Sequence, residues 1–366
     1  MCIRDRNQTI RSKDGNRFTG EPGAILSGAR LLTSFTRSGN YWVIGGQTQQ
    51  GQVHGECQAA FPRCSYAEQL FIDDQLQTHV ASLSQVTAGK WYFDYGTDQI
   101  YMGSDPTGRK VETSVTTTAF EAVGNNVTIA NLIVEKYANI AQWGAIHGDG
   151  RSGWVVSGVE VRWNHGVGLR TTAGMRLTGS KIHHNAGPGL WLDIDNINFT
   201  IDGNTTEDNY SNMQAASPGI FIEISYGGVV RNNIVRRNGA GFNPWLWGAG
   251  ILVAASGGSG LEITGNTVEN NENGIALIQQ NRGSGAHGAY TVQNVWVHDN
   301  TIRMARGMTG AVQDWGGTGI YSGRNNRFER NTYYLSPEAR FAWMDGERSD
   351  AQWRAYGQDT TGTFNR

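Results

Sequence analysis

Short apolar segments that each follow a glycine recur through the second half of the chain. Apolar and polar residues alternate within each segment, as in a strand with one buried face. The starting glycines lie 21 to 31 residues apart, a period typical of solenoids in which each coil buries its inner face against its neighbours. The pattern predicts an all-β protein folded as a right-handed parallel β-helix. The segments are GLRTT from Gly168, GLWLD from Gly189, GIFIE from Gly219, GILVA from Gly250 and GIALI from Gly274.

Pairs of asparagines recur in phase with these glycines. The segments IDGNTTEDN, VRNNIVRRN, ITGNTVENN and GRNNRFERN each carry two asparagines five residues apart. Asparagine tolerates left-handed turn conformations, and its amide can bond to the equivalent backbone of the next coil. We therefore expect these asparagines at the corners of the coils.

The stretch from 40 to 112 does not follow the period. It contains EQLFIDDQ, KWYFDYG and QIYMGSD, which alternate between turn residues like antiparallel strands. These segments predict an antiparallel β subdomain inserted near the N-terminus, and Ser349 is placed to cap a short C-terminal helix. The expected segments are an N-terminal cap and first coil at 1–39, the inserted β subdomain at 40–112, the parallel β-helix at 113–335 and a C-terminal cap at 336–366.

Composition narrows the class of protein and the compartment. Fifty glycines, seven prolines and 17% charged residues describe a turn-rich β protein, and a net charge of -2 gives no field that would attract nucleic acid or an anionic membrane. No stretch approaches the roughly 18 to 20 apolar residues of a spanning helix. The opening MCIRDR lacks the apolar run of a signal peptide and reads like a truncated start. Cys57 and Cys64 favour a short disulfide-closed loop, and we expect an extracellular or periplasmic protein.

Two acidic side chains are expected on the outer face of neighbouring coils. In GLWLD the leucines point inward, so Trp191 and Asp193 point outward, and in GIFIE the same alternation turns Phe221 and Glu223 outward. Parallel strands lie about 4.8 Å apart, which places the two carboxyl groups about 5 to 6 Å apart. This separation suits a glycoside hydrolase that retains the anomeric configuration.

The chemistry of glycoside cleavage explains why such a pair is useful. A glycosidic oxygen must be protonated to leave, and the developing oxocarbenium ion must be met by an anion. Repulsion between two close carboxylates favours keeping one of them protonated near neutral pH. Glu223 has the longer reach and is the candidate acid/base, whereas Asp193 is the candidate nucleophile.

Other side chains near the pair are candidates for substrate contact. Long connections from Asn209 to Gly219 and from Asn238 to Gly250 flank Glu223, and the segment Gln279 to Tyr290 is expected to form the opposite wall. Aromatic rings in such loops can pack against sugar C–H groups. The candidates are Trp191, Phe221, Arg170, Trp245, Trp247, Asp195 and His287, with Tyr210, Phe242 and Arg282 in the same loops and Asp149 as a residue that could tune the acids or bind a cation.

The segments GLWLD and GIFIEIS resemble the paired motifs of a β-helical glycoside hydrolase family that includes β-xylosidases. In that family a Trp-Leu-Asp strand supplies the nucleophile and a Phe-Val-Glu type strand on the next coil supplies the acid/base. The resemblance implies these roles for Asp193 and Glu223. A wider resemblance, to the pectin-lyase-like β-helix superfamily, covers most of 115–335. The chain differs at Ile194, where the family usually has an aromatic residue, and at Ser225 to Gly227, where it has a histidine-containing turn.

Two other functions compete with hydrolysis. Many β-helix proteins are polysaccharide lyases or epimerases that act on uronate polymers with Ca²⁺, and carboxylates such as Asp193, Asp195 and Glu223 are suitable ligands for that ion. A lyase also needs an outward cationic base, for which Arg170 is the evident candidate. A non-catalytic glycan-binding β-helix would need no paired acids. We expect a plant or microbial poly- or oligosaccharide as partner and no required cofactor, with Ca²⁺ as an alternative; the sugar and the oligomeric state stay open.

Overall fold

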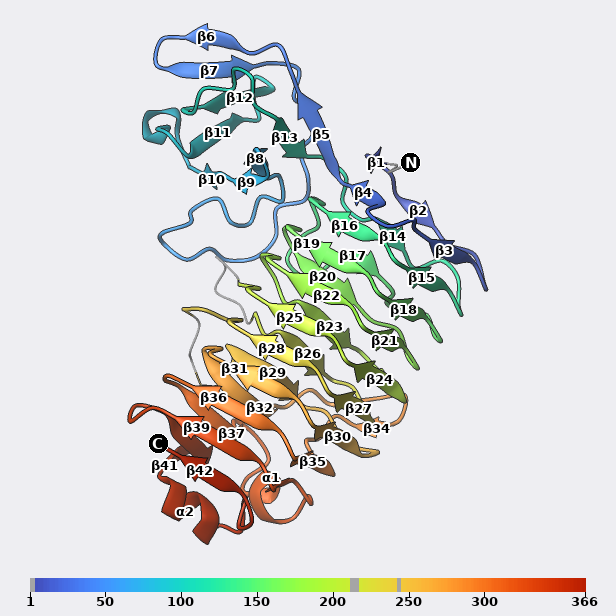
Figure 1. Cartoon of the computed structure of the whole chain (residues 1–366), viewed down its shortest axis with the longest axis vertical. Helices are drawn as coiled ribbons and strands as arrows, with labels where there is room; N and C mark the ends of the chain where they lie inside the picture. Colours follow the sequence, from blue (N-terminus) through green and yellow to red (C-terminus); the bar gives the residue numbers. More distant parts are fainter. Residues whose placement is uncertain (1–3, 211–216, 242–244) are drawn as a thin grey trace.

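The computed structural model describes residues 4–210, 217–241 and 245–366. Three long sheets run along the molecule, and nearly all of their neighbouring strands are parallel and come from successive coils (Figure 1). The chain passes through the first, second and third sheet in turn and then begins the next coil. The predicted right-handed parallel β-helix is confirmed.

The first sheet carries the glycine-led strands of the sequence repeat. Its inner side chains, such as Leu190, Leu192, Ile220 and Ile222, are fully buried in the core of the helix. In spatial order its strands are β2 (Ile10–Arg11), β14 (Phe120–Glu121), β17 (Gly144–His147), β20 (Val167–Arg170), β23 (Leu190–Asp193), β26 (Ile220–Glu223), β29 (Ala249–Ala254), β32 (Asn273–Gln279), β37 (Met308–Gln313), β40 (Arg340–Trp343) and β41 (Gly346–Arg348).

The second and third sheets complete each coil. The second sheet contains β3 (Arg17–Thr19), β15 (Thr128–Ala130), β18 (Val155–Ser157), β21 (Arg176–Thr178), β24 (Phe199–Asp202), β27 (Gly228–Arg231), β30 (Leu261–Thr264), β35 (Val295–His298) and β38 (Arg327–Glu329). The third contains β1 (Arg4–Arg6), β4 (Ile25–Ser27), β16 (Ile133–Glu135), β19 (Glu160–Arg162), β22 (Lys181–His183), β25 (Thr205–Glu207), β28 (Ile234–Arg236), β31 (Thr267–Glu269), β36 (Thr301–Met304), β39 (Thr332–Leu335) and β42 (Thr363–Asn365).

Asparagine ladders stack at two corners of the coils, as the sequence predicts. In one ladder the backbone N–H of Asn209 donates to Oδ1 of Asn238 at 3.1 Å, and the backbone N–H of Asn238 donates to Oδ1 of Asn271 at 2.9 Å. Each amide therefore satisfies a backbone group that the tight corner leaves open. The ladders run through Asn164, Asn185, Asn209, Asn238 and Asn271 and through Asn204, Asn233, Asn266, Asn300 and Asn331.

The glycine repeat and the asparagine repeat have one physical cause. A Cβ on Gly189 would lie 2.7 Å from Nδ2 of Asn209, and a Cβ on Gly219 would lie 2.6 Å from Nδ2 of Asn238. Both distances are shorter than real Cβ contacts allow. The strand that follows each corner must therefore begin with glycine wherever a ladder asparagine packs against it.

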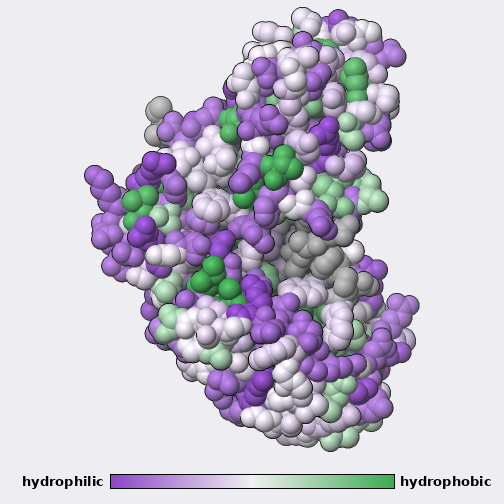
Figure 2. All heavy atoms as spheres, turned by 180° about the vertical axis from the view of Figure 1, so that it is seen from behind, coloured by the Kyte–Doolittle hydropathy of each residue, from purple (hydrophilic) through white to green (hydrophobic). Residues whose placement is uncertain are grey.

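The inserted subdomain projects as a separate lobe at the N-terminal end of the helix (Figures 1 and 2). Its apolar core includes Trp91, Phe93, Leu70 and Ile100, all buried. Its strands lie between 29 and 114. The predicted limits of 40 and 112 stay a prediction. They are β5 (Ala29–Leu32), β13 (Val111–Ser114), β8 (Leu70–Ile72) and β9 (Gln75–Leu76) in one sheet, and β10 (Thr78–His79), β11 (Lys90–Asp94), β12 (Gln99–Met102), β7 (Tyr41–Ile44) and β6 (Thr36–Ser38) in another. The 3-10 turn η1 (Leu83–Gln85) connects β10 to β11.

A buried ion-pair cluster joins the inserted subdomain to the helix. The ammonium group of Lys136, which has no exposed surface, contacts the carboxylates of Glu112 and Asp74. Arg6 also reaches Glu112, with 2.6 Å between Nη1 and Oε1. Because a buried charge is tolerated only when it is paired, this cluster fixes how the lobe meets the first coils.

The predicted disulfide and the predicted C-terminal cap are both present. Cys57 and Cys64 are joined, with their Cα atoms 5.5 Å apart. Ser349 caps the short helix α2 (Asp350–Ala355), since its hydroxyl accepts a hydrogen bond from the backbone N–H of Gln352 at 3.3 Å. The remaining elements are α1 (Gly319–Ser322) and the hairpin of β33 (Ser284–Gly285) and β34 (Gly288–Ala289). No helix in the described ranges is long and apolar enough to cross a membrane.

Candidate active site

Asp193 and Glu223 are direct neighbours on the outer face of the first sheet. Strands β23 and β26 pair in parallel, and the register sets Trp191 opposite Phe221 and Asp193 opposite Glu223. Adjacent strands are about 4.8 Å apart, so the two carboxyl groups share one short stretch of the sheet surface. The predicted register of the two acids is the register of the structure.

The carboxyl group of Asp193 is buried and held from one side. Nη2 of Arg170, on the preceding strand β20, donates to Oδ2 at 2.7 Å and also lies 3.1 Å from Asp149. Among the described residues, Oδ1 of Asp193 has no hydrogen-bond partner. Burial raises the pKa of Asp193 to about 7, although the positive charge of Arg170 opposes the rise. Arg170 thus orients this carboxyl and leaves one oxygen available.

Glu223 meets a different arginine. Arg282 contacts Oε1 of Glu223 from the segment that leads into the hairpin of β33 and β34. Burial raises the pKa of the Glu223 carboxyl, and the charge of Arg282 opposes that rise. Arg282 itself is exposed. The two acids therefore have separate cationic partners, one built into the sheet and one on a surface loop.

Aromatic side chains form an apolar floor beside the acids. The rings of Trp191 and Phe221 stack with centroids 5.3 Å apart, and Trp247 meets Phe221 edge-on at 6.2 Å. Trp191 and Phe221 point outward as predicted, yet both are buried beneath neighbouring side chains. Trp245 is 51% exposed and presents more surface for a ligand than the other three rings. The predicted substrate contacts of these rings stay predictions.

Asp195 has structural partners in the opposite wall. Its Oδ1 accepts a hydrogen bond from the hydroxyl of Tyr290 at 2.8 Å and from the backbone N–H of Ala286 at 3.1 Å. The exposed His287 packs edge-on against Tyr226, with ring centroids 5.1 Å apart. Asp195 therefore fastens the hairpin to the turn that follows the Asp193 strand, and its predicted contact with substrate, like that of His287, remains untested.

The remaining predicted residues lie apart from the pair or outside the described ranges. Tyr210 lines a separate pocket against the inserted subdomain, and Phe242 lies outside the described residues. Within the ranges the structure describes, no group of three or more His, Cys, Asp or Glu side chains could hold a metal ion. The expectations about cofactors, Ca²⁺ included, stay predictions.

The sequence reasoning missed an extension of the outer face. His147, on β17, is the register neighbour of Arg170 and stacks on Trp143 with ring centroids 3.7 Å apart. Burial lowers the pKa of His147 to about 3, so the ring is neutral. The segment AIHGD contains most of this strand. The alternation of its side chains turns His147 outward, and this is the sequence signal that points to the residue.

Comparisons with known proteins agree with the architecture. A family model described as "Right handed beta helix region" matches residues 110–255. The structure of XylC in complex with xylose is similar at 11% identity and a TM-score of 0.50, over 92% of this chain and 62% of that chain. A second structure, described as a glycoside hydrolase, aligns at 9% identity and a TM-score of 0.38, over 98% of this chain and 91% of that chain. No curated protein sequence matches the chain.

The likeness to the XylC structure, at such low identity, concerns the fold alone. This chain spans less than two thirds of the length of the XylC structure. The fold of this protein is the right-handed parallel β-helix, shared with the XylC structure and with the family model that matches its central coils.

Proposed function

We propose that this chain is a retaining glycoside hydrolase in which Asp193 is the nucleophile and Glu223 the acid/base. The observation that carries the proposal is the pairing of the two acids at equivalent positions of β23 and β26, on the outer face. Retaining enzymes place their carboxyl groups about 5 to 5.5 Å apart, close to the spacing of adjacent strands. The similarity to a β-helical structure with bound xylose supports a carbohydrate substrate, and we propose a plant or microbial poly- or oligosaccharide.

In the first step Oδ1 of Asp193 attacks the anomeric carbon. The carbon–oxygen bond to the leaving sugar breaks as Glu223 transfers its proton to the glycosidic oxygen, and an ester to Asp193 forms. The oxygen that has no partner among the described residues is free for this attack, while Arg170 holds the other. Arg170 therefore acts as a positioning residue.

In the second step water hydrolyses the ester. Glu223, now ionised, takes a proton from the water molecule, which attacks the anomeric carbon and releases Asp193 as a carboxylate. Arg282 stabilises the ionised form of Glu223 and must move away before the protonated form can act as an acid. Its exposed position on a loop permits that movement.

The lyase and epimerase alternative is less well supported by the contacts of Arg170. A lyase base must reach a sugar proton, whereas the guanidinium of Arg170 is buried between Asp193 and Asp149 and donates to the carbonyl of Gln142 at 2.9 Å. The exposed ring of Trp245 offers a surface for a sugar in either case. The disulfide between Cys57 and Cys64 supports an extracellular or periplasmic location, which we also propose.

The test is Glu223→Gln assayed on a panel of activated aryl glycosides and polysaccharides. We expect loss of activity on polysaccharides and recovery of turnover on an activated aryl glycoside when azide replaces the acid/base. Glu347→Gln, at an exposed position of β41, is the matched control and should keep full activity. Unchanged activity of Glu223→Gln refutes the assignment, and release of an unsaturated uronide instead of a reducing end would identify a lyase.

A further inference from the structure

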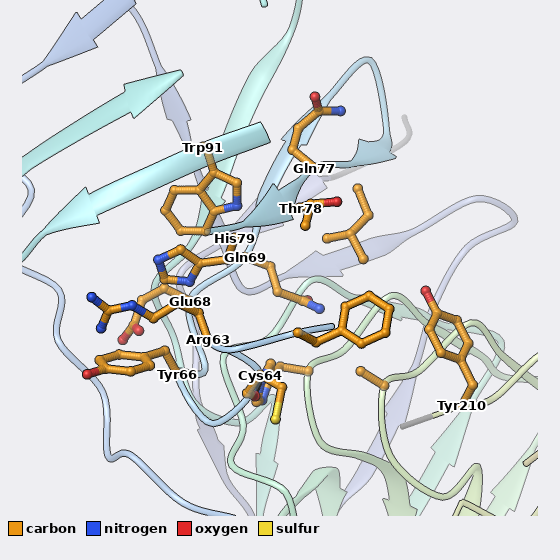
Figure 3. Close-up of a pocket in the computed structure, with 14 residues that line it drawn as sticks. Arg63, Cys64, Tyr66, Glu68, Gln69, Gln77, Thr78, His79, Trp91 and Tyr210 are labelled. Atoms are coloured by element: carbon orange, nitrogen blue, oxygen red, sulfur yellow. Dashed lines mark hydrogen bonds between the residues drawn. The ribbon is translucent and has the colours of Figure 1, made fainter. Parts of the chain in front are cut away.

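A pocket away from the acidic pair lies between the inserted subdomain and the coils of the helix. Its volume is about 190 Å³, and its lining includes neither Asp193 nor Glu223. The subdomain contributes most of the wall, and the helix contributes His165, Ala186 and Tyr210 (Figure 3). His165 ties the two parts together, since its ring nitrogens lie 2.7 Å from the carbonyl of Cys64 and 2.9 Å from that of Asn139.

Residues that line the pocket carry buried polar atoms that have no partner among the described residues. These atoms are Oε1 of Gln69, Nε1 of Trp91 and both ring nitrogens of His79. Gln69 and Trp91 are 8% and 0% exposed, and Figure 3 shows the Gln69 amide reaching into the space between Thr78 and Cys64. An unpaired buried polar group costs about 1 to 3 kcal/mol, so a ligand toward which these side chains turn gains the missing hydrogen bonds.

Aromatic rings line the same space. The His79 ring stacks on Trp91 with centroids 4.1 Å apart, and Tyr66 meets His79 edge-on at 5.9 Å. Phe61 and Tyr210 also line the pocket. Flat rings beside donors and acceptors suit a ligand with both C–H and O–H surfaces.

The charges of the pocket favour a neutral ligand. Burial lowers the pKa of His79 to about 3, so its ring carries no charge. The buried Glu68 accepts a hydrogen bond from the hydroxyl of Tyr95 at 2.8 Å and repels anions. Arg63 packs over Tyr66 and donates to the carbonyl of Ala81 at 3.2 Å, which directs its guanidinium to protein partners.

We propose that this pocket is a binding site for one neutral monosaccharide unit, either free or at the end of an oligosaccharide. Its volume is below the roughly 300 Å³ at which pockets for drug-sized ligands begin, so it suits one ring and not a chain segment. The site is an addition to the proposed hydrolase and does not depend on it, because it requires binding alone.

The test is binding measured by calorimetry and ligand-observed NMR. The probes are D-xylose, L-arabinose, D-glucose and D-galactose, with xylobiose and cellobiose to separate free sugars from chain ends and D-glucuronate as an anionic competitor. Thr78→Tyr fills the pocket from its exposed rim, and Gln75→Tyr on the neighbouring exposed strand is the matched control. Gln69→Leu removes the side-chain amide and Trp91→Phe removes the indole N–H, and both substitutions keep an apolar side chain at the position.

We expect a neutral sugar or a disaccharide to bind wild type, and to bind at least tenfold more weakly to Thr78→Tyr, Gln69→Leu and Trp91→Phe. The control Gln75→Tyr should bind as wild type does, which ties the loss of binding to the pocket itself. If a buried variant fails to fold, Thr78→Tyr still decides the question. The proposal is overturned if none of the neutral sugars binds, if the pocket variants bind unchanged, or if glucuronate binds more tightly than every neutral sugar.

Discussion

Replacing Asp193 by Asn should stabilise the protein increasingly as the pH rises. The unfolded chain has the ordinary aspartate pKa of 3.8, and burial raises the pKa to about 7 in the folded protein. The folded state therefore keeps a proton that the unfolded chain releases, so this group contributes stability that is fully present below pH 3.8 and is lost as the pH rises through about 7. At 1.36 kcal/mol for each pKa unit, the loss is about 4 kcal/mol. Asparagine cannot ionise and avoids it.

The measurement is urea unfolding of wild type and Asp193→Asn from pH 4 to pH 8.5. The difference in free energy of unfolding should grow in favour of the variant, with most of the growth between pH 4 and 7. Asp299→Asn is the control of opposite sign, because the hydrogen bond from Arg330 lowers the pKa of Asp299 to about 2. That exposed pair is screened by solvent, so its loss should cost well under about 1 kcal/mol near neutral pH. A pH-independent difference for Asp193→Asn would refute the reasoning.

Three further perturbations test the surroundings of the site and the fold. Arg170→Leu should raise the pKa of Asp193 further, by about 1 to 3 units, and move the acidic limb of kcat/KM to higher pH; an unmoved limb in the pH profile would contradict the positioning role. Lys136→Met should lower the free energy of unfolding, measured in urea, by about 3 to 5 kcal/mol, because Glu112 loses a buried partner. A loss under about 1 kcal/mol would contradict the role of the buried ion-pair cluster. Asn238→Ala should lower Tm, at about 1 to 3 kcal/mol for each backbone group left unpaired in the adjacent coils.

The β-helix could be predicted because its coils repeat the same local requirements. Gly189 and Gly219 recur where a ladder asparagine leaves no space for a Cβ, and Leu190 and Ile220 recur because each coil has the same inner face. Such signals are local in sequence and are reinforced by every repeat. The limits of the inserted subdomain have no such repetition. Strand β5 pairs with β13, which is about 80 residues later in the sequence, and no repeat in the sequence predicts that pairing.

The acidic pair could be predicted for the same reason, whereas the contact of Arg282 with Glu223 could not. The side-chain alternation of β23 and β26 turns Asp193 and Glu223 outward once the register is known. The contact of Arg282 with Glu223 joins residues 59 apart through a loop whose path the repeat does not fix. The pocket of Gln69, His79 and Trp91 is further out of reach, since it forms where a non-repeating lobe meets the coils.

The two kinds of contact around the acids differ in how freely they can vary. Arg170 lies on β20, which pairs with the Asp193 strand β23 in the first sheet. Any change in its position would therefore disturb the register of those two strands. Arg282 is carried by the segment before a hairpin, which Asp195 fastens through the hydroxyl of Tyr290 and the backbone of Ala286. The hairpin can therefore change in length or sequence while those anchors keep it over the acids. Because the proposed catalytic pair lies on the sheet and the hairpin lies beside it, we expect sugar specificity to depend on the hairpin and the long connections. Exchanging 283–289, with Arg282 and Tyr290 kept, should alter KM among substrates more than kcat.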